Sequence, residues 1–191
     1  MFDKTVSDLA AIDEVFNLAS LPEPRIEPEI VLHIARAPQM GVSEYELIHC
    51  IDWLAHGFEI VYSIFPDWIF AVEDAVAAYG VQGALLLGTR HPVSSDPAKW
   101  HEMLSNFTIE LTGTDGKPVR GCGRNVLGGG PLRALRFLME ELVRFPACEP
   151  LRPGKLVTTG TLTSAMPAIS GQTWATKLAG IDVGGLSLRL R

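Results

Sequence analysis

Three glutamates have the residue type and spacing that could bind a metal ion. Glu27 and Glu29 stand two apart in the run PRIEPEIVLHI, and Glu59 lies in the apolar run FEIVYSIF. Side chains two apart on a strand share a face, and carboxylates held together raise each other's pKa unless a cation neutralises them. Hard divalent ions prefer oxygen ligands. The pattern therefore predicts a Mg²⁺ or Mn²⁺ site, although ordinary surface glutamates on a solvated strand have the same E-x-E spacing.

The apolar setting of Glu59 adds to this prediction. A carboxylate among buried apolar side chains must be ion-paired, protonated or bound to metal. An arginine partner, or a position on the solvent face of an edge strand, would explain it as well as a metal would. Spacing in the sequence does not place Glu59 beside Glu27 and Glu29.

Two histidines are weak candidates for catalysis. His33 shares the strand face of Glu27 and Glu29, where it could be a further ligand or proton carrier. His56 is expected at a helix end just before Glu59, where it could bind the last carbonyls or act as a general base. Histidines in such places more often serve structure, so the catalytic residues stay unassigned.

The elements that must position these side chains follow from periodicity. Alternation over 25–34 predicts a strand, and Pro28 cannot donate to a ladder, so this strand should lie at an edge or be bulged there. An S-x-x-E capping box at Ser43 begins a predicted helix that ends near Gly57. A strand over 58–64 comes next, and Asp67 can cap a helix running to about residue 79.

The rest of the chain reads as mixed strands and helices. We expect a helical lead-in over 1–22, a buried strand over 81–88, and a hairpin over 106–119 that turns at Asp115 and Gly116. A helix begins at Pro131, and three short strands follow from Leu156 onward. This order predicts an α+β fold built around a curled, barrel-like sheet, as a single domain over 1–191.

Composition narrows the function classes. The chain has 191 residues, 47% of them hydrophobic, and 16 basic against 22 acidic residues give a net charge of −6. No basic block is present, so nucleic acid is not an expected partner. No apolar run approaches the ~20 residues of a membrane span, and the N-terminus does not resemble a signal peptide. Cys50, Cys122 and Cys148 form no CxxC pair, which is typical of a reducing cytoplasm.

Several runs together carry a family resemblance. PRIEPEIVLHI, IDWLAHGFEIV, IFPDWIFAVEDAVA, GALLLG and PLRPGKLVTTGTLTSAMPAISGQTWAT resemble the 2-keto-4-pentenoate hydratase branch of the fumarylacetoacetate hydrolase superfamily, from about residue 24 to the C-terminus. By this resemblance Glu27, Glu29 and Glu59 match the metal ligands. Gly160 and Thr161 match a loop that contacts substrate.

The same resemblance covers Trp68 and the fold. Trp68 fits a W-x5-D pattern and could line the substrate pocket. The family fold is a mixed β-roll with peripheral helices, and its members are usually oligomers. We therefore expect a homo-oligomer.

The function implied by the resemblance is metal-dependent hydration of a small 2-oxo acid, a 2-oxo-4-enoate, through a metal-stabilised enolate. Decarboxylation of a 2-oxo diacid is the alternative reaction. Family members normally carry a longer N-terminal region with a lysine and an acidic residue. Residues 78–81 replace the Asp-Asn-x-Ser stretch of the hydratases, and Val72 stands where the C–C hydrolases have a lysine. A truncated paralogue that serves a full-length homologue as a structural or regulatory subunit is the non-enzyme alternative.

Overall fold

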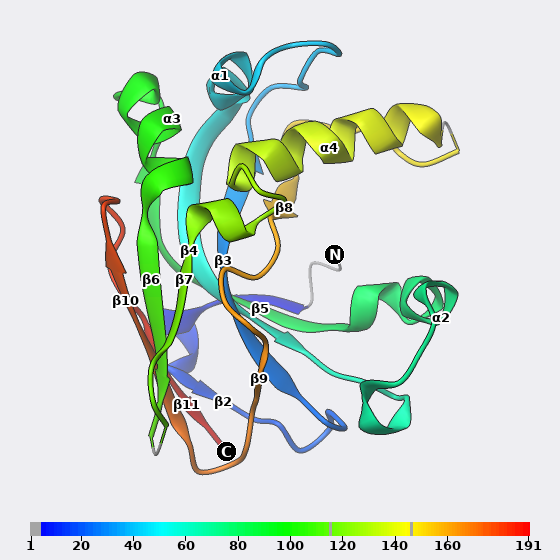
Figure 1. Ribbon diagram of the computed structural model, residues 1–191, viewed down its shortest axis with the longest axis vertical. Helices are drawn as coiled ribbons and strands as arrows, with labels where there is room; N and C mark the ends of the chain where they lie inside the picture. The colour runs from blue at the N-terminus through cyan, green and yellow to red at the C-terminus, as the bar shows by residue number, and fades with distance from the viewer. Residues whose placement is uncertain (1–4, 115, 146) are drawn as a thin grey trace.

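Two mixed β-sheets form the frame of the protein, and the helices lie around them (Figure 1). The computed structural model describes residues 5–114, 116–145 and 147–191. The first sheet has the strand order β1-β5-β4-β3-β8, with β9 also paired to β3, and the second has the order β2-β11-β10-β6-β7. The predicted α+β class with a mixed β-roll is confirmed.

The strands of the first sheet are β1 (Val6–Asp8), β3 (Arg25–Ile34), β4 (Ile51–Val61), β5 (Gln82–Pro92), β8 (Leu156–Thr158) and β9 (Met166–Pro167). Those of the second are β2 (Val15–Phe16), β6 (Thr108–Gly113), β7 (Val119–Cys122), β10 (Thr173–Ala179) and β11 (Ser187–Leu190). The α-helices are α1 (Glu44–Leu47), α2 (Val72–Ala77), α3 (Pro97–Asn106) and α4 (Pro131–Arg144). Short 3-10 turns cover Leu9–Ile12, Ile48–Cys50, Pro66–Trp68, Tyr79–Val81 and Gly123–Asn125.

The core lies between the sheets and extends under three helices. Phe58 and Ile60 of β4 belong to one buried cluster with Trp174 of β10 and Leu188 of β11. A second, larger cluster joins the sheets to α1, α3 and α4, which contribute buried residues such as Leu47, Trp100, Leu104 and Leu135. The inner face of the first sheet is therefore apolar, and its outer face is left to carry the glutamates.

Most of the strongly patterned predictions are confirmed. The strand over 25–34, the buried strand that became β5, the hairpin of β6 and β7, the helix from Pro131 and the three C-terminal strands are all present. Asp115, the first residue of the predicted hairpin turn, lies outside the described residues. In the part of the chain that the structure describes, no helix is long and apolar enough to cross a membrane.

The predicted helix over 43–57 is wrong beyond its first turns. Ser43 does form the capping box with Glu46, but α1 and the 3-10 turn after it end at Cys50, and the chain continues as β4. His56 consequently lies in a strand, and not at a helix end. Gly57 lies inside β4 beside β5, where a Cβ would meet the Leu86 carbonyl oxygen at 2.9 Å.

Two further predictions need correction. Residues 5–22 are not a helical lead-in: they form β1, a 3-10 turn and β2. Asp67 does not cap α2, because it sits in a separate turn with φ of 57°, and Asp74 instead accepts a hydrogen bond from the Ala71 N–H at 3.0 Å.

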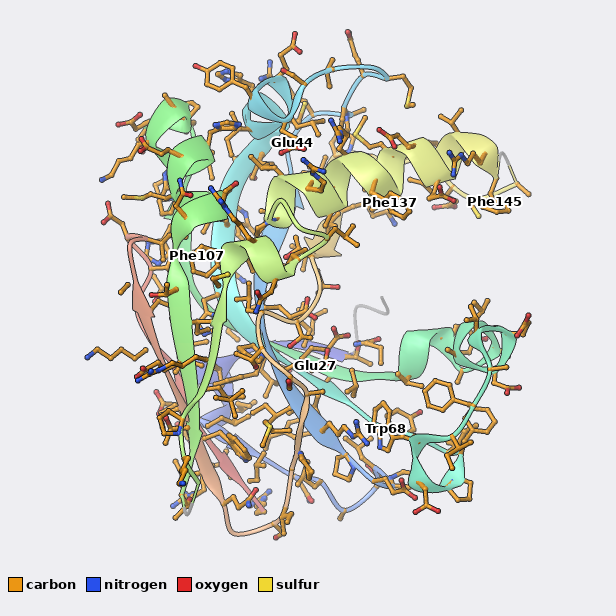
Figure 2. The ribbon with its side chains drawn as sticks, in the orientation of Figure 1. Glu27, Glu44, Trp68, Phe107, Phe137 and Phe145 are labelled. Atoms are coloured by element: carbon orange, nitrogen blue, oxygen red, sulfur yellow. The ribbon has the colours of Figure 1, made fainter. Side chains whose placement is uncertain are left out.

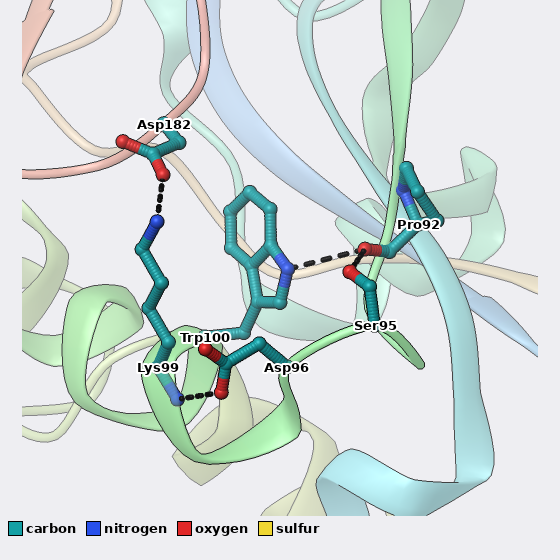
Figure 3. A network of polar contacts seen from close by, with 6 residues as sticks. All are labelled: Pro92, Ser95, Asp96, Lys99, Trp100 and Asp182. Atoms are coloured by element: carbon teal, nitrogen blue, oxygen red, sulfur yellow. Dashed lines mark hydrogen bonds and ion pairs between the residues drawn. The ribbon is translucent and has the colours of Figure 1, made fainter.

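Helix α3 was not predicted. Asp96 caps it by accepting from the Lys99 N–H at 3.1 Å, and Trp100 donates to the Pro92 carbonyl at 3.2 Å (Figure 3). The Lys99 side chain pairs with Asp182 of the C-terminal segment. The Asp96-Pro97 pair is a helix-start signal that the sequence does contain.

Pro28 lies in an interior strand, which differs from the predicted edge or bulge. β3 pairs with β4 along its whole length, and Pro28 stands opposite Phe58. On its other side β3 pairs with β9 at Arg25–Ile26 and with β8 at Val31–His33. Pro28 falls in the opening between those two partners, where its missing N–H breaks no ladder.

Candidate metal centre

Three carboxylates meet on the outer face of the first sheet. The antiparallel register of β3 and β4 sets Glu27 directly opposite Glu59, and Glu29 follows two residues along the same face. One carboxylate oxygen from each residue lies within 4.8 Å of the others. Figure 2 shows Glu27 near the middle of the molecule, beside the crossing strands. The structure thus brings together the three residues that the sequence singled out.

Burial makes this acidic cluster unfavourable without a cation. Glu29 is 1% exposed and Glu59 9% exposed. Burial and the neighbouring Glu59 carboxylate raise the pKa of Glu27 to about 7. Burial raises the pKa of Glu29 well above its usual range and raises the pKa of Glu59 as well. The Glu59 carboxylate beside Glu29 adds to the rise that burial causes in the pKa of Glu29.

The donor set fits a hard divalent cation. All three groups offer oxygen, and deprotonated carboxylates in a partly dry site need compensating positive charge. Without a cation, neighbouring buried carboxyl groups keep protons, because two negative charges held together repel each other. The burial of the cluster and the convergence of its three oxygens therefore favour a bound cation.

The loop after β8 positions one of these carboxylates. The Gly160 N–H donates to Glu29 Oε2 at 3.0 Å, and Gly160 has a φ of +102°. Thr161 uses its hydroxyl within the loop, donating to the Thr163 carbonyl at 3.0 Å. Gly160 therefore orients a candidate ligand, while contact of Gly160 and Thr161 with substrate stays a prediction.

His56 points away from the cluster, into the core between the sheets. It is 1% exposed, its Nδ1 lies 2.9 Å from the Glu29 carbonyl oxygen, and its Nε2 lies 2.9 Å from Thr176 Oγ1. Burial lowers its pKa to about 4. Because a carbonyl only accepts, neutral His56 donates from Nδ1, and Nε2 accepts from the Thr176 hydroxyl. His56 thus holds the Glu29 backbone from behind, which is a positioning contact.

His33 keeps the predicted face but lies beyond the cluster. Its Nδ1 contacts Asp52 Oδ1 at 2.6 Å, and its ring stacks on Trp53 with 4.7 Å between centroids. Among the described residues, the group whose ligand atoms lie close enough to hold one ion does not include His33.

Trp68 lies on the segment that leads to α2 (Figure 2). Its Nε1 donates to the Glu23 carbonyl at 2.9 Å, and the Arg25 guanidinium lies over its ring at 4.2 Å. Arg25 in turn lowers the pKa of Glu27 through its charge. Sequence reasoning did not single out Arg25, although its position two residues before Glu27 places it on the same strand face.

Comparisons with known proteins agree with this geometry. The chain is 29% identical over 154 residues to the 2-hydroxyhexa-2,4-dienoate hydratase of Comamonas testosteroni, covering 80% of this chain and 55% of that protein. It is 30% identical over 170 residues to the 2-keto-4-pentenoate hydratase of Burkholderia vietnamiensis, covering 88% and 62%. The chain therefore spans somewhat more than half the length of these relatives. No protein-family model matches it.

A solved structure shares the fold. The 4-oxalocrotonate decarboxylase from Pseudomonas putida G7, complexed with magnesium and adipate, superposes with a TM-score of 0.80 at 22% identity, over 99% of this chain and 67% of that one. With the ordered glutamates and these sequence matches, the chain belongs to the fumarylacetoacetate hydrolase superfamily. Within it, the chain falls in the branch of the 2-keto-4-pentenoate hydratases.

Proposed function

We propose that this protein is a metal-dependent hydro-lyase that hydrates small 2-oxo-4-enoic acids. The observation that carries the proposal is the convergence of Glu27, Glu29 and Glu59, whose oxygens lie within 4.8 Å in a buried setting. The hydratase relatives support the reaction class. The magnesium of the decarboxylase structure supports Mg²⁺, with Mn²⁺ as the other expected ion.

The three glutamates would hold the ion, and a bound divalent cation supplies Lewis-acid polarisation of a 2-oxo group and charge for the enolate. The chain's own groups orient this site. Gly160 fixes Glu29 through its N–H, and His56 fixes the backbone of the same residue. Arg25 adds a positive charge beside Glu27, suited to attract an anionic substrate. The general acid or base stays unassigned.

The direct test follows the ultraviolet absorbance of a 2-hydroxy-2,4-dienoate in the presence of Mg²⁺ or Mn²⁺. We expect depletion that needs the metal, and we expect Glu59→Gln to lower turnover at least a hundredfold while also weakening Mn²⁺ binding. Glu102→Gln, an exposed glutamate of α3, is the matched control and should behave as the parent protein. Turnover that persists in chelator, or in Glu59→Gln, would contradict the proposal.

Decarboxylation of a 2-oxo diacid is the second candidate. It is favoured by the likeness to the decarboxylase structure and would use the same carboxylates and the same enolate. A panel that includes a 2-oxo-enedioic acid separates the two reactions. A protein that binds metal and 2-oxo acid but turns over neither class would instead match the subunit alternative, in which it pairs with a longer homologue.

We further propose that the protein works in the cytoplasm as a homo-oligomer. Ile69, Val72 and Val76, which lie on and beside α2, are 78%, 78% and 72% exposed. Large apolar side chains gathered on one surface are typical of protein contacts.

A further inference from the structure

A cavity of about 520 Å³ opens beside Glu59. It lies between β8 and α4 on one side and the turn of residues 79–81 on the other, which are the elements that flank the outer face of the first sheet in Figure 1. Pockets of roughly 300–1,000 Å³ bind drug-sized ligands, which are larger than a five-carbon 2-oxo acid. The cavity has room for a longer chain.

The floor of the cavity changes from polar to apolar along β8. Thr158 pairs with Val31, and Leu156 pairs with His33, so both side chains lie on the sheet face that carries Glu29. Gly160, two residues further on, touches Glu29 itself. Moving away from the carboxylates along β8, the cavity therefore meets the Thr158 hydroxyl and then the Leu156 side chain.

Helix α4 and the segment after it supply a second apolar wall. Leu138 and Leu142 are one helical turn apart, so they share a helix face, and both line the cavity. Leu151 lines it beside them. All three are half-buried, which leaves apolar surface open to a ligand.

The charges of the lining do not suit a second carboxylate at the far end. Among the described residues that line the cavity, Glu59 and Glu149 are acidic and Lys155 is the only basic one. Lys155 and Glu149 are both exposed, and among the described residues no cation is buried in the distal wall. A distal carboxylate would meet one exposed cation and one exposed anion, so the lining offers it no net charge complement.

We propose that this cavity makes the protein selective for 2-oxo monoacids that have an apolar tail and more than five carbons in total. This inference rests on the proposed metal-dependent function. The 2-oxo acid end lies at the glutamate cluster, and the tail lies between Leu156 and the leucines of α4. The cavity disfavours 2-oxo diacids.

The expected size of the preference follows from apolar burial. A fully buried methylene stabilises a complex by about 0.8 kcal/mol, which is about fourfold in affinity. Because this cavity is open to solvent, we expect affinity to rise about two- to fourfold per methylene, which is about eightfold or more for three methylenes.

The test is a binding series on the Mg²⁺-loaded protein by isothermal titration calorimetry. The ligands are 2-oxopentanoate, 2-oxooctanoate and 2-oxoadipate. We expect 2-oxooctanoate to bind at least about eightfold tighter than 2-oxopentanoate, and 2-oxoadipate to bind no tighter than 2-oxopentanoate.

Variants locate the preference. Leu142→Gln should reduce the 2-oxooctanoate preference to less than threefold and leave 2-oxopentanoate affinity unchanged. Val143→Gln, the next residue of α4, does not line this cavity and is the matched control. Leu138→Gln provides a second probe of the same wall, and thermal unfolding checks that each variant is folded.

The outcomes separate this inference from the proposed function. If none of the three ligands binds in the presence of Mg²⁺, the proposed function itself fails. If 2-oxopentanoate binds but 2-oxooctanoate is not favoured, or if 2-oxoadipate binds tightest, the selectivity is overturned while the metal-dependent function stands. An unchanged preference in Leu142→Gln and Leu138→Gln overturns the placement of the tail.

Discussion

Glu27 connects the acidic cluster to an observable pH dependence. Its pKa is raised from 4.5 to about 7, so the metal-free folded protein holds a proton that the unfolded chain releases. Where the folded state binds more protons, stability falls as pH rises. Burial lowers the pKa of His56 to about 4, so below pH ~6.5 the unfolded chain binds more protons at this residue and stability rises with pH. Above pH ~6.5, His56 is neutral in both the folded and the unfolded state. The informative window therefore lies above pH ~6.5.

We predict that the metal-free protein loses stability between pH ~6.5 and ~8.5. The loss should be about 1 kcal/mol from Glu27 alone and more with Glu29, whose pKa is also raised. Mg²⁺ or Mn²⁺ should reverse it, because the ion replaces the protons. Thermal unfolding with and without metal measures this, and Glu27→Gln should make the loss of stability with pH smaller. Stability that rises with pH across this window would contradict the account.

The sequence predicted part of this cluster at the residue scale. Period two in β3 placed Glu27 and Glu29 on one face, which is a local property of any strand. The meeting with Glu59 depends on the register of β3 against β4, and that register is fixed by long-range pairing that spacing does not encode. Family resemblance supplied the link that local chemistry could not.

At the scale of elements, the loop from β8 to Gly160 is the feature that ties the sheet to the cluster. Gly160 has a φ of +102°, and a Cβ there would meet nothing within 4 Å. Substitution by alanine would therefore act through backbone strain alone, without a clash. Strain of this kind costs about 1–3 kcal/mol and would move the N–H that binds Glu29.

We predict that Gly160→Ala lowers Mn²⁺ affinity about tenfold or more along with stability. Gly171→Ala is the matched control, because Gly171 has a φ of +89° and also has open space around it. The control should lose stability without losing metal affinity. Calorimetric metal titration and thermal unfolding of both variants give the comparison, and equal metal affinity in Gly160→Ala would exclude this orienting role.

The failed helix prediction over 43–57 has a physical cause at the same scale. β4 is buried from Leu54 to Val61 on both faces, so the alternation that marks a half-buried strand is absent. Leu47, Ile48, Ile51, Leu54 and Ala55 then match a helical period by chance, and the genuine capping box at Ser43 reinforces it. Strands with one solvent-facing side, such as β6 and β10, kept their pattern and were predicted correctly.

At the scale of the whole molecule, α2 is an outlying element. The helix buries none of its residues, and Val72 and Val76 are largely exposed. Figure 1 shows α2 at the periphery, away from the second sheet. Such a surface is suited to contact with another chain.

We predict that the purified protein is a dimer or larger and that α2 contributes to the contact. Val72→Lys combined with Val76→Lys should shift the mass toward the monomer in size-exclusion chromatography with light scattering. Val143→Lys, at an exposed valine of α4, should leave the mass unchanged. A parent protein that is monomeric at all concentrations would refute the prediction.

The order in which strands pair within the two sheets could not be predicted from the sequence. β10 pairs with β6 across about sixty to seventy residues of chain, and β1 adds in parallel to β5. Such contacts depend on which buried faces fit together, and a local pattern reports only that a face exists. The curled mixed sheet could be predicted as a class, whereas the division into two sheets could not.

Pro28 has a consequence for the balance of hydrogen-bond donors and acceptors in the sheet. The Pro28 carbonyl accepts from the Leu162 N–H at 2.9 Å, so its nitrogen also points to the side of β3 between β8 and β9. Pro28 and Leu162 are both buried there. A buried N–H without an acceptor costs about 1–3 kcal/mol. Because proline has no N–H, this position needs only the one donor that Leu162 supplies. The residue that looked like an obstacle to an interior strand therefore suits a place where β3 has no strand partner on one side.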